Sequence, residues 1–332
     1  MSDYISINNI NQINAELTNY CNAACPMCPR FDVNLNLQKD ITNNSHTTLQ
    51  LIKTKISTRV LSNLRTFRSC GNLGDGSMNP ECLEIYDYVK SYGPPIMLLN
   101  TNGGARTSDF WEEMAKLEVV VTFSIDGLSD TNHLYRRNVK WEKLMNNVNA
   151  FIQAGGVAEW DYLIFKHNEH QVDEAIALSK KLGFKKFNKK YTTRWDDFDS
   201  DGNWITRTSI NIADYKLEKP STEIKSKESF ATQKTIESIN MTKKINCYSF
   251  HNNNSEIYIA ANGDISPCCW LGDLKIHEAK NIIKNYQNVN LNYATLEQIL
   301  EGDFFKQLWN GIQGLENSYR LNTCYHTCGV RT

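Results

Sequence analysis

The stretch that decides the fold is "ELTNYCNAACPMCPR", residues 16 to 30. It places Cys21, Cys25 and Cys28 in a C-x3-C-x2-C spacing directly after a strand-like run. Three thiolates can hold three corners of a cubic four-iron cluster, whereas an ordinary ferredoxin cluster uses four cysteines. The spacing therefore predicts a cluster whose fourth iron is open to a small molecule. A zinc site that takes a distant fourth ligand is the alternative interpretation.

The residues around this stretch predict an α/β fold, because short apolar strands alternate with amphipathic helices from about residue 12 to 192. Six such β/α units predict a parallel sheet with helices outside it. We expect a partial (β/α)6 parallel barrel, two units short of an eight-fold barrel. The expected strands are 13–19, 64–71, 95–104, 119–127, 160–168 and 185–191, and the expected helices are 48–64, 80–93, 108–117, 141–156 and 169–184.

Two further regions follow the barrel. Residues 193–245 are polar and rich in turn formers, which predicts a loop or linker with possible substrate contacts. Residues 246–332 predict a small α+β domain. In it, "SEIYIAANGDISPCCW" has an Asn-Gly turn typical of a hairpin, and "TLEQILEGDFFKQLWNGIQ" has the spacing of an amphipathic helix. The predicted domains are therefore 1–192, 193–245 and 246–332.

Composition limits the partners and the location. The 332 residues are 41% hydrophobic and 22% charged, with a formal net charge of −1. This balance is typical of a soluble globular protein and argues against nucleic acid or an anionic membrane as partner. The local basic run "FKKFNKKY" is typical of a solvated strand edge. The sequence has no apolar run of about 20 residues, and its first residues have no signal-peptide pattern, so we expect a cytoplasmic protein.

The cysteine spacing, its place after a first strand and the β/α units that follow it resemble the radical S-adenosylmethionine (SAM) superfamily. Met27 stands where that family often has an aromatic residue. The resemblance implies that Cys21, Cys25 and Cys28 bind a 4Fe-4S cluster whose open iron takes the amino and carboxylate groups of SAM. It also implies that one electron from the reduced cluster cleaves SAM, and that the resulting 5′-deoxyadenosyl radical abstracts a hydrogen atom from the substrate.

The same resemblance assigns cofactor contacts at the ends of the later strands, where parallel α/β folds bind ligands. "CGNLGDG" looks like the family's Gly-rich segment that holds the SAM amino group, with Asp75 as its carboxylate. "NTNGG" and "SIDG" are similar to segments that contact SAM or substrate, and Arg136 resembles the arginine that pairs with the SAM carboxylate, with Arg137 as the alternative. The implied cofactor-binding residues are Gly71, Asn72, Gly74, Asp75, Asn100, Asn102, Ser124, Asp126, Arg136, His167 and Asn168.

A second cysteine group resembles the C-terminal SPASM/twitch extensions of radical SAM enzymes. Cys247, Cys268, Cys324 and Cys328 are separated by 20, 55 and 3 residues and would provide four ligands. The full SPASM form uses more cysteines for two clusters, so one auxiliary 4Fe-4S cluster of the twitch type is implied. Either Cys268 or Cys269 is the ligand, and the G-x4-C spacing from Gly263 favours Cys268. Structural zinc is the alternative.

The substrate and the outcome of the reaction stay open at this point. We expect oxidation of a small polar metabolite, similar to a sugar or cyclitol, with Arg194 and Trp195 as substrate contacts. The first cluster cysteine is residue 21, which argues against a leader-binding domain, yet oxidation, epimerisation or crosslinking of a short peptide or protein is an alternative. Epimerisation would need a hydrogen donor, and Cys70 is the candidate catalytic residue, with a buried bystander thiol as the other interpretation.

Three further expectations concern electron transfer and alternative functions. The resemblance implies a flavodoxin or ferredoxin as electron donor. A non-enzymatic iron–sulfur electron carrier is an alternative, which would require a fully ligated first cluster. A radical enzyme that modifies nucleic acid is the third, and the balanced charge argues against it.

Overall fold

The structure, a computed structural model, falls into two compact units that each combine distant parts of the chain. The first unit comprises Met1–Tyr20, Asn43–Met97 and Ile236–Thr332, and the second comprises Cys21–Thr42 and Leu98–Thr235. None of the helices in the described part of the chain is long and apolar enough to span a membrane. The structure describes residues 7–32, 35–41, 44–94, 96–192, 194–198, 204–212, 215–221, 245–250, 255–272 and 289–314, together with Cys324 and Cys328.

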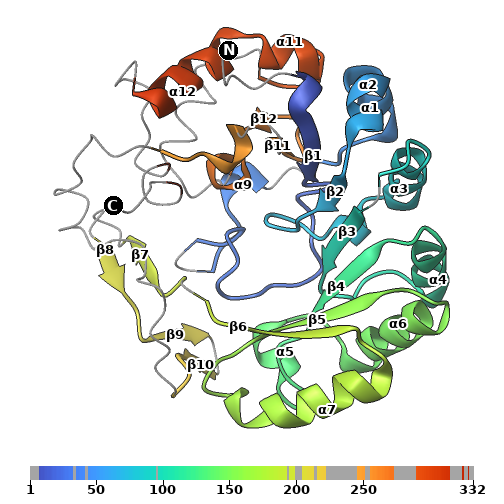
Figure 1. The fold of residues 1–332 in the computed structure, drawn as a ribbon. Helices are drawn as coiled ribbons and strands as arrows, with labels where there is room; N and C mark the ends of the chain where they lie inside the picture. The colour runs from blue at the N-terminus through green and yellow to red at the C-terminus, as the bar shows by residue number, and fades with distance from the viewer. Residues whose placement is uncertain are drawn as a thin grey trace. The chain divides into compact units, whose positions relative to one another are not determined.

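The sheet of the first unit is built around β1 (Ile10–Ala15), which has neighbours on both edges. β1 pairs in parallel with β2 (Thr66–Ser69) on one side and with β11 (Ser255–Ile259) on the other. β12 (Ile265–Ser266) closes the predicted hairpin with β11 in antiparallel register. Figure 1 shows β11 and β12, in orange, beside the blue β1. The sequence predicts the hairpin correctly but not this pairing, which joins the C-terminal region to the first strand.

Three helices of the first unit, α1, α2 and α11, begin at side-chain caps. Thr48 accepts a hydrogen bond from the amide of Leu51, and Ser57 accepts one from the amide of Val60. The predicted helix 48–64 is therefore two helices, because Ile56 between them is extended. The predicted helix 295–313 likewise divides at Gly302. The helices of this unit are α1 (Leu49–Lys55), α2 (Thr58–Asn63), α3 (Cys82–Lys90), α9 (Cys269–Gly272), α11 (Leu296–Leu300) and α12 (Asp303–Gln313).

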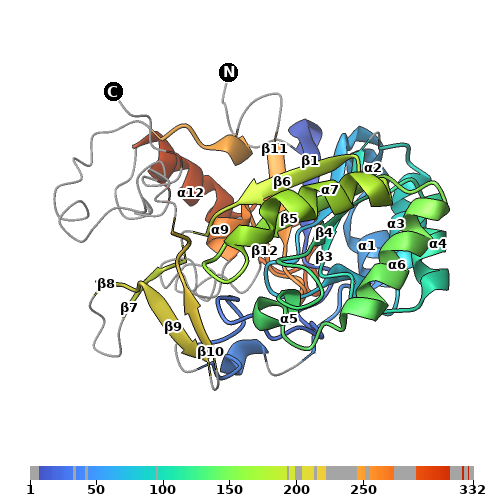
Figure 2. The same ribbon diagram turned by 90° about the horizontal axis from the view of Figure 1, so that it is seen from below.

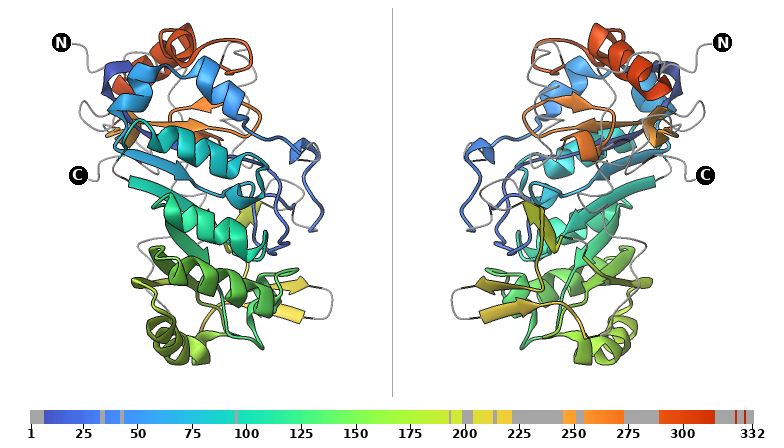
Figure 3. Two further views of the ribbon diagram at one scale, coloured as in Figure 1. Left: turned by 90° about the vertical axis from the view of Figure 1, so that its right-hand side faces the viewer. Right: turned by 90° about the vertical axis from the view of Figure 1, so that its left-hand side faces the viewer.

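The second unit contains the later β/α units. Its strands β3 to β6 pair in parallel in chain order, and β3 begins at Ile96 in the first unit. Trp111, Phe123 and Phe151 pack as an aromatic cluster between helices and sheet. The helices α4, α6 and α7 lie along one side of the strands, as Figures 2 and 3 show. The elements are β3 (Ile96–Thr101), α4 (Ser108–Lys116), β4 (Val120–Ser124), α5 (Asn132–Tyr135), α6 (Trp141–Gln153), β5 (Ala158–Leu163), α7 (Val172–Leu182) and β6 (Lys186–Lys190).

Two short hairpins follow β6, where the sequence predicts only a loop. β7 (Asp196–Phe198) pairs antiparallel with β8 (Trp204–Thr206), and β9 (Ser209–Ile212) pairs antiparallel with β10 (Tyr215–Glu218). The sequence does not predict these four strands within the loop of residues 193–245. The alternation of apolar and polar residues in "SINI" and "YKLE" is a strand pattern, but each run is only four residues long, too short to stand out among the surrounding turn formers. Residues 222–244 of the predicted loop or linker lie outside the described residues.

Gly74 gives the most direct test of the packing in the first unit. A Cβ atom at this position would lie 1.9 Å from the backbone oxygen of Thr18. We expect Gly74→Ala to lower the free energy of unfolding by more than about 3 kcal/mol, because backbone on both sides must move. Urea-induced unfolding would measure the change.

Gly93 provides the matched control. It has a φ of +78°, but a Cβ there would meet no atom within 4 Å. Gly93→Ala should therefore cost only about 1 kcal/mol, the penalty of the left-handed conformation. Equal losses in the two variants would contradict the packing described for Gly74.

Candidate functional site

The cysteine loop, residues 21–28, lies in the second unit, and backbone contacts hold its shape. The amide of Cys28 donates to the carbonyl of Cys25 over 3.0 Å. The guanidinium of Arg30, which is only 6% exposed, donates to the carbonyls of Cys21 and Ala23 over 3.5 and 3.4 Å. Arg30 was not among the predicted site residues, although an arginine two residues after the last cysteine is a visible signal. It fixes the turn that presents the three thiols.

Asn102 connects the loop to the end of β3. Its side-chain nitrogen donates to Sγ of Cys21 over 3.5 Å and to the side-chain oxygen of Asn22 over 2.9 Å. Its oxygen accepts a hydrogen bond from the amide of Gly104 over 2.8 Å. The structure thus brings the predicted Asn102 to the first cysteine. Asn100 lies within β3 and is half-buried.

Arg136 connects the loop to the end of β4. Its Nε donates to Oδ2 of the fully buried Asp126 over 2.6 Å, and its Nη1 lies 3.7 Å from Sγ of Cys25. The other oxygen of Asp126 accepts from the amide of Leu163 over 2.7 Å. Burial raises the pKa of the Cys25 thiol to about 11, and the positive charge of Arg136 opposes that rise. The alternative residue, Arg137, contacts the loop through its carbonyl, which accepts from the amide of Ala24.

These contacts fit an iron–sulfur ligand set. The amide of Ala23 and the side chain of Asn102 both donate to Sγ of Cys21, and a cation faces Sγ of Cys25. Hydrogen bonds and positive charge at the sulfurs stabilise cysteines as thiolates, and such donors tune iron–sulfur clusters. The second unit contains only these three cysteines of the ten in the chain.

The other predicted cofactor residues of this unit, Asn168, His167 and Ser124, differ in burial and in their contacts. The side chain of Asn168 is fully buried and bonded to the backbone of Asp126, Leu163 and Phe165, so it fixes the turn after β5. His167 stacks on Phe165, and its Nδ1 lies 2.5 Å from the hydroxyl of Tyr215. Burial lowers the pKa of His167 to about 4, with smaller contributions from His170 and His133. Ser124 is half-buried at the end of β4.

The two predicted substrate residues follow β6. Arg194 is exposed, and its Nη1 donates to the carbonyl of Met27 in the cysteine loop over 3.2 Å. Trp195 is only 5% exposed and packs edge-on against Phe165. Of this pair, Arg194 is therefore the side chain open to solvent.

The Gly-rich loop, residues 71–75, lies in the first unit and is held by a residue that was not among the predicted site residues. Glu16, the residue after β1, is 1% exposed. Its Oε1 accepts from the amide of Asn72 over 2.6 Å and from the thiol of Cys70 over 2.8 Å, and its Oε2 accepts from the amide of Leu73 over 3.3 Å. Burial raises the pKa of Glu16 to about 7, although these hydrogen bonds oppose the rise.

The remaining members of this loop have defined structural roles. Gly71 has a φ of +67°, which favours glycine. The carboxylate of Asp75 accepts from the amide and hydroxyl of Ser77 over 3.1 and 2.7 Å and caps a short 3-10 turn. Burial and the nearby Glu16 raise the pKa of Cys70 well above its ordinary value, so its sulfur is a neutral thiol.

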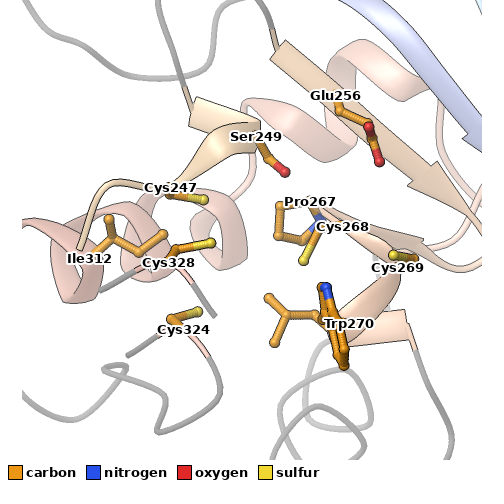
Figure 4. A pocket seen from close by; sticks show the side chains of 11 residues that line it. Cys247, Ser249, Glu256, Pro267, Cys268, Cys269, Trp270, Ile312, Cys324 and Cys328 are labelled. Carbon is orange, nitrogen blue, oxygen red and sulfur yellow. The ribbon is translucent and has the colours of Figure 1, made fainter. Parts of the chain in front are cut away.

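The second cysteine group also lies in the first unit. Cys247, Cys268, Cys324 and Cys328 line one cavity of about 290 Å³. Figure 4 shows the sulfur of Cys268 directed toward the other three, whereas Cys269 lies farther from them. The sulfur of Cys269 instead forms a hydrogen bond with the side chain of Asn72. This geometry supports Cys268 as the ligand and fits a group bound by four thiolates.

The described residues contain no three His, Cys, Asp or Glu side chains that converge closely enough to hold one metal ion. A four-iron cluster binds each cysteine to a different iron, so it does not require the sulfurs to converge on one point.

Glu16 predicts a pH-dependent stability. Its pKa is about 7 in the folded chain against 4.5 for an ordinary glutamate, so the native state binds the proton more tightly. The resulting stabilisation is complete below pH 4.5 and is lost as the pH rises through about 7. Between pH 5.5 and 8 the wild type should lose about 2 kcal/mol relative to Glu16→Gln. Urea unfolding of both proteins at each pH measures this difference, and a constant difference would contradict it.

Comparisons with known proteins support the fold. No family model and no curated protein sequence matches the chain. SuiB from Streptococcus suis aligns with a TM-score of 0.58 at 14% identity, over 92% of this chain and 68% of SuiB. A structure of SuiB bound to the precursor peptide SuiA aligns with a TM-score of 0.55 at 11% identity, over 91% and 67%. The enzyme anSMEcpe with bound AdoMet aligns with a TM-score of 0.54 at 12% identity, over 97% and 85%.

These solved structures are radical SAM enzymes that carry SPASM or twitch domains. Identities of this size show the fold alone, and that fold is the mostly parallel α/β arrangement predicted from the sequence. The chain therefore has the fold of the radical SAM enzymes with a C-terminal auxiliary-cluster domain.

Proposed function

We propose that the chain is a radical SAM enzyme. Cys21, Cys25 and Cys28 would hold a 4Fe-4S cluster whose fourth iron binds SAM. When bound and reduced, this cluster would supply the electron for reductive cleavage of SAM, and with it the radical chemistry that removes a hydrogen atom from a substrate. One observation carries the proposal: the unit that contains the cysteine loop has three cysteines and no fourth, and protein donors face the sulfurs of Cys21 and Cys25.

The protein's own residues would prepare this site in two ways. Asp126 holds Arg136 so that the guanidinium faces Cys25, where it also suits the carboxylate of SAM. Asn102 holds the opposite end of the loop at Cys21. The remaining cofactor contacts are proposals from the resemblance: Gly71, Asn72, Gly74 and Asp75 for the amino group, Asn100 and Ser124 near SAM or substrate, and His167 and Asn168 near adenine.

The second cysteine group would hold an auxiliary 4Fe-4S cluster. All four thiolates of Cys247, Cys268, Cys324 and Cys328 face one cavity, so every iron would have a protein ligand. Such a cluster has no open iron for substrate. It would transfer electrons, for which we propose a flavodoxin or ferredoxin as the external donor.

Two substrate classes have support. The sequence favours a small polar metabolite. The solved structures of SuiB with its precursor peptide SuiA and of anSMEcpe with the Cp18Cys peptide support a peptide as the second candidate. In either case Arg194 is the proposed substrate contact, because it is exposed and bonded to the cysteine loop, and the buried Trp195 would hold the segment in place.

Iron counting and SAM cleavage test the proposal together. Anaerobically reconstituted wild type should contain about eight irons, matching two four-iron clusters. The triple variant Cys21→Ala, Cys25→Ala, Cys28→Ala should keep about four and form no 5′-deoxyadenosine from SAM and dithionite. The pair Cys247→Ala, Cys328→Ala should also lose about half of the iron. Cys82→Ala, which removes a buried thiol outside both groups, is the control and should keep all of it.

The outcomes separate the alternatives. Wild type with both clusters that never cleaves SAM, with or without candidate substrates, would identify an electron carrier instead of an enzyme. Zinc in place of the second half of the iron would contradict the auxiliary cluster and leave the SAM site in place.

Asp126 gives a sharper prediction about the site. Asp126→Asn keeps the shape of the side chain but weakens its hold on Arg136, because a charge-assisted bond becomes a neutral one. SAM cleavage should slow by about tenfold to a hundredfold, which corresponds to losing a hydrogen bond between charged groups. The iron content should not change. Asp161→Asn removes another carboxylate of the same unit, which pairs with Lys190, and is the control. An unchanged rate in Asp126→Asn would contradict the proposed role of the pair.

A further inference from the structure

We propose that Glu16 is a positioning residue whose buried carboxylate holds the Gly-rich loop in the shape that binds the SAM amino group. Cys70 completes the anchor by donating its thiol hydrogen to the same carboxylate. The inference rests on the proposed function, which assigns the Gly-rich loop to SAM.

The contacts of Glu16 concentrate on this loop. Its two oxygens accept from the amides of Asn72 and Leu73 and from the thiol of Cys70, and the amide of Gly74 contributes as well. Donors from consecutive backbone amides thus converge on one side chain. A single carboxylate therefore sets the path of the backbone from residue 72 to 74.

Two further contacts restrict the backbone conformation of the Gly-rich loop. Gly74 packs directly against the backbone of Thr18, where even a methyl group does not fit. The amide of Asp75 donates to the carbonyl of Tyr20 over 2.9 Å. Thr18, Tyr20 and Glu16 all follow β1, so the segment that leads into the cysteine loop also defines the shape of the Gly-rich loop.

The carboxylate at position 16 costs stability, which argues that it is kept for a different reason. A side chain that is 1% exposed must lose its hydration when it ionises, and its pKa near 7 shows that the loop donors only partly offset this cost. Burial raises the pKa of the two nearby thiols, Cys70 and Cys269, and a thiol supplies no positive charge that could stabilise the carboxylate. A buried acid that costs stability when it ionises is explained if the loop it holds binds the cofactor.

This assignment also gives Cys70 a role other than hydrogen-atom transfer. Its S–H is directed at Oε1 of Glu16 over 2.8 Å. A hydroxyl in its place would keep that hydrogen bond, but an O–H bond is too strong to serve as a hydrogen-atom donor to a carbon radical. Serine and alanine at position 70 therefore distinguish an anchor from a hydrogen donor.

Hydrogen exchange of the SAM-free holoprotein tests the anchor alone. In Glu16→Gln an NH₂ group replaces one acceptor and faces backbone donors, so the amides of Asn72 and Leu73 should exchange at least about tenfold faster. Glu81→Gln is the matched control, because Glu81 also accepts a backbone amide hydrogen, from Leu49 over 2.6 Å, but does not touch the Gly-rich loop. Unchanged exchange at Asn72 and Leu73 in Glu16→Gln would overturn the anchor.

SAM affinity tests the consequence. Equilibrium dialysis of reconstituted protein with radiolabelled SAM should show a Kd raised about tenfold or more in Glu16→Gln and in Cys70→Ala, and a nearly normal Kd in Cys70→Ser and Glu81→Gln. If the loop amides of Glu16→Gln exchange faster but the Kd for SAM is unchanged, the proposal that this loop shape serves SAM binding is overturned. Loss of substrate turnover in Cys70→Ser at normal SAM affinity would show that Cys70 is the hydrogen donor and overturn its assignment as an anchor.

The pH dependence of the Kd for SAM is a further test. If Glu16 had only a structural role, the effect of Glu16→Gln on this Kd would not depend on pH. The ionised form of Glu16 accepts all of the loop donors, so the ratio of Kd between Glu16→Gln and wild type should grow as the pH rises from 6 to 8. A ratio independent of pH would overturn the assignment of the carboxylate as the anchor. Wild type that contains its clusters but binds no SAM would contradict the proposed function itself, while the exchange measurement would still decide whether Glu16 holds the loop.

Discussion

The contact on which the cysteine loop depends most is the one between Arg136, Asp126 and Cys25. A buried carboxylate holds the guanidinium over 2.6 Å, and the guanidinium faces the thiol at 3.7 Å. The buried carboxylate of Asp126 would be costly without a cation, and so would a buried thiolate at Cys25. The half-buried Arg136 supplies that cation to both. The three groups therefore need one another, and together they connect the loop to the end of β4. These contacts give the cysteine loop a defined geometry at this point.

The two units divide the proposed chemistry between them. The second unit supplies the three thiols and the groups that face them, while the first supplies the Gly-rich loop and the four thiols of the other cysteine group. Within the first unit, β1 pairs with β11 of the C-terminal hairpin, and Glu16, the residue after β1, holds the Gly-rich loop. The short segment before Cys21 is thus as important to the proposed function as the cysteines themselves.

The sequence predicted those features that depend on local pattern. The six parallel strands, the hairpin around Asn262 and Gly263, and the cysteine loop after β1 all follow from periodicity or spacing. The parallel pairing of β11 with β1 could not be predicted, because it joins residues about 245 positions apart and leaves no local signal. The hairpins after β6 were missed because their strands are only three or four residues long.

The site shows the same limit. Asn102, Asp126 and Arg136 were predicted because each stands in a motif beside a strand end, and the structure brings all three to the cysteine loop or to one another. Glu16 was not, because a single acid in "AELTN" looks like any exposed strand residue, and only the fold reveals that it is buried and surrounded by amides. Asp75 was expected to offer its carboxylate to a ligand, and in the structure that carboxylate caps a turn.

The central claim is that three thiolates leave one iron open and that SAM occupies it. The most direct measurement is electron–nuclear double resonance of the reduced cluster in wild-type protein, with SAM labelled by ¹⁵N at its amino group and by ¹⁷O at its carboxylate. We predict hyperfine coupling from both labels, because both groups would bind the open iron. A reduced cluster with a strong signal but no coupling from either label, at saturating SAM, would contradict the account.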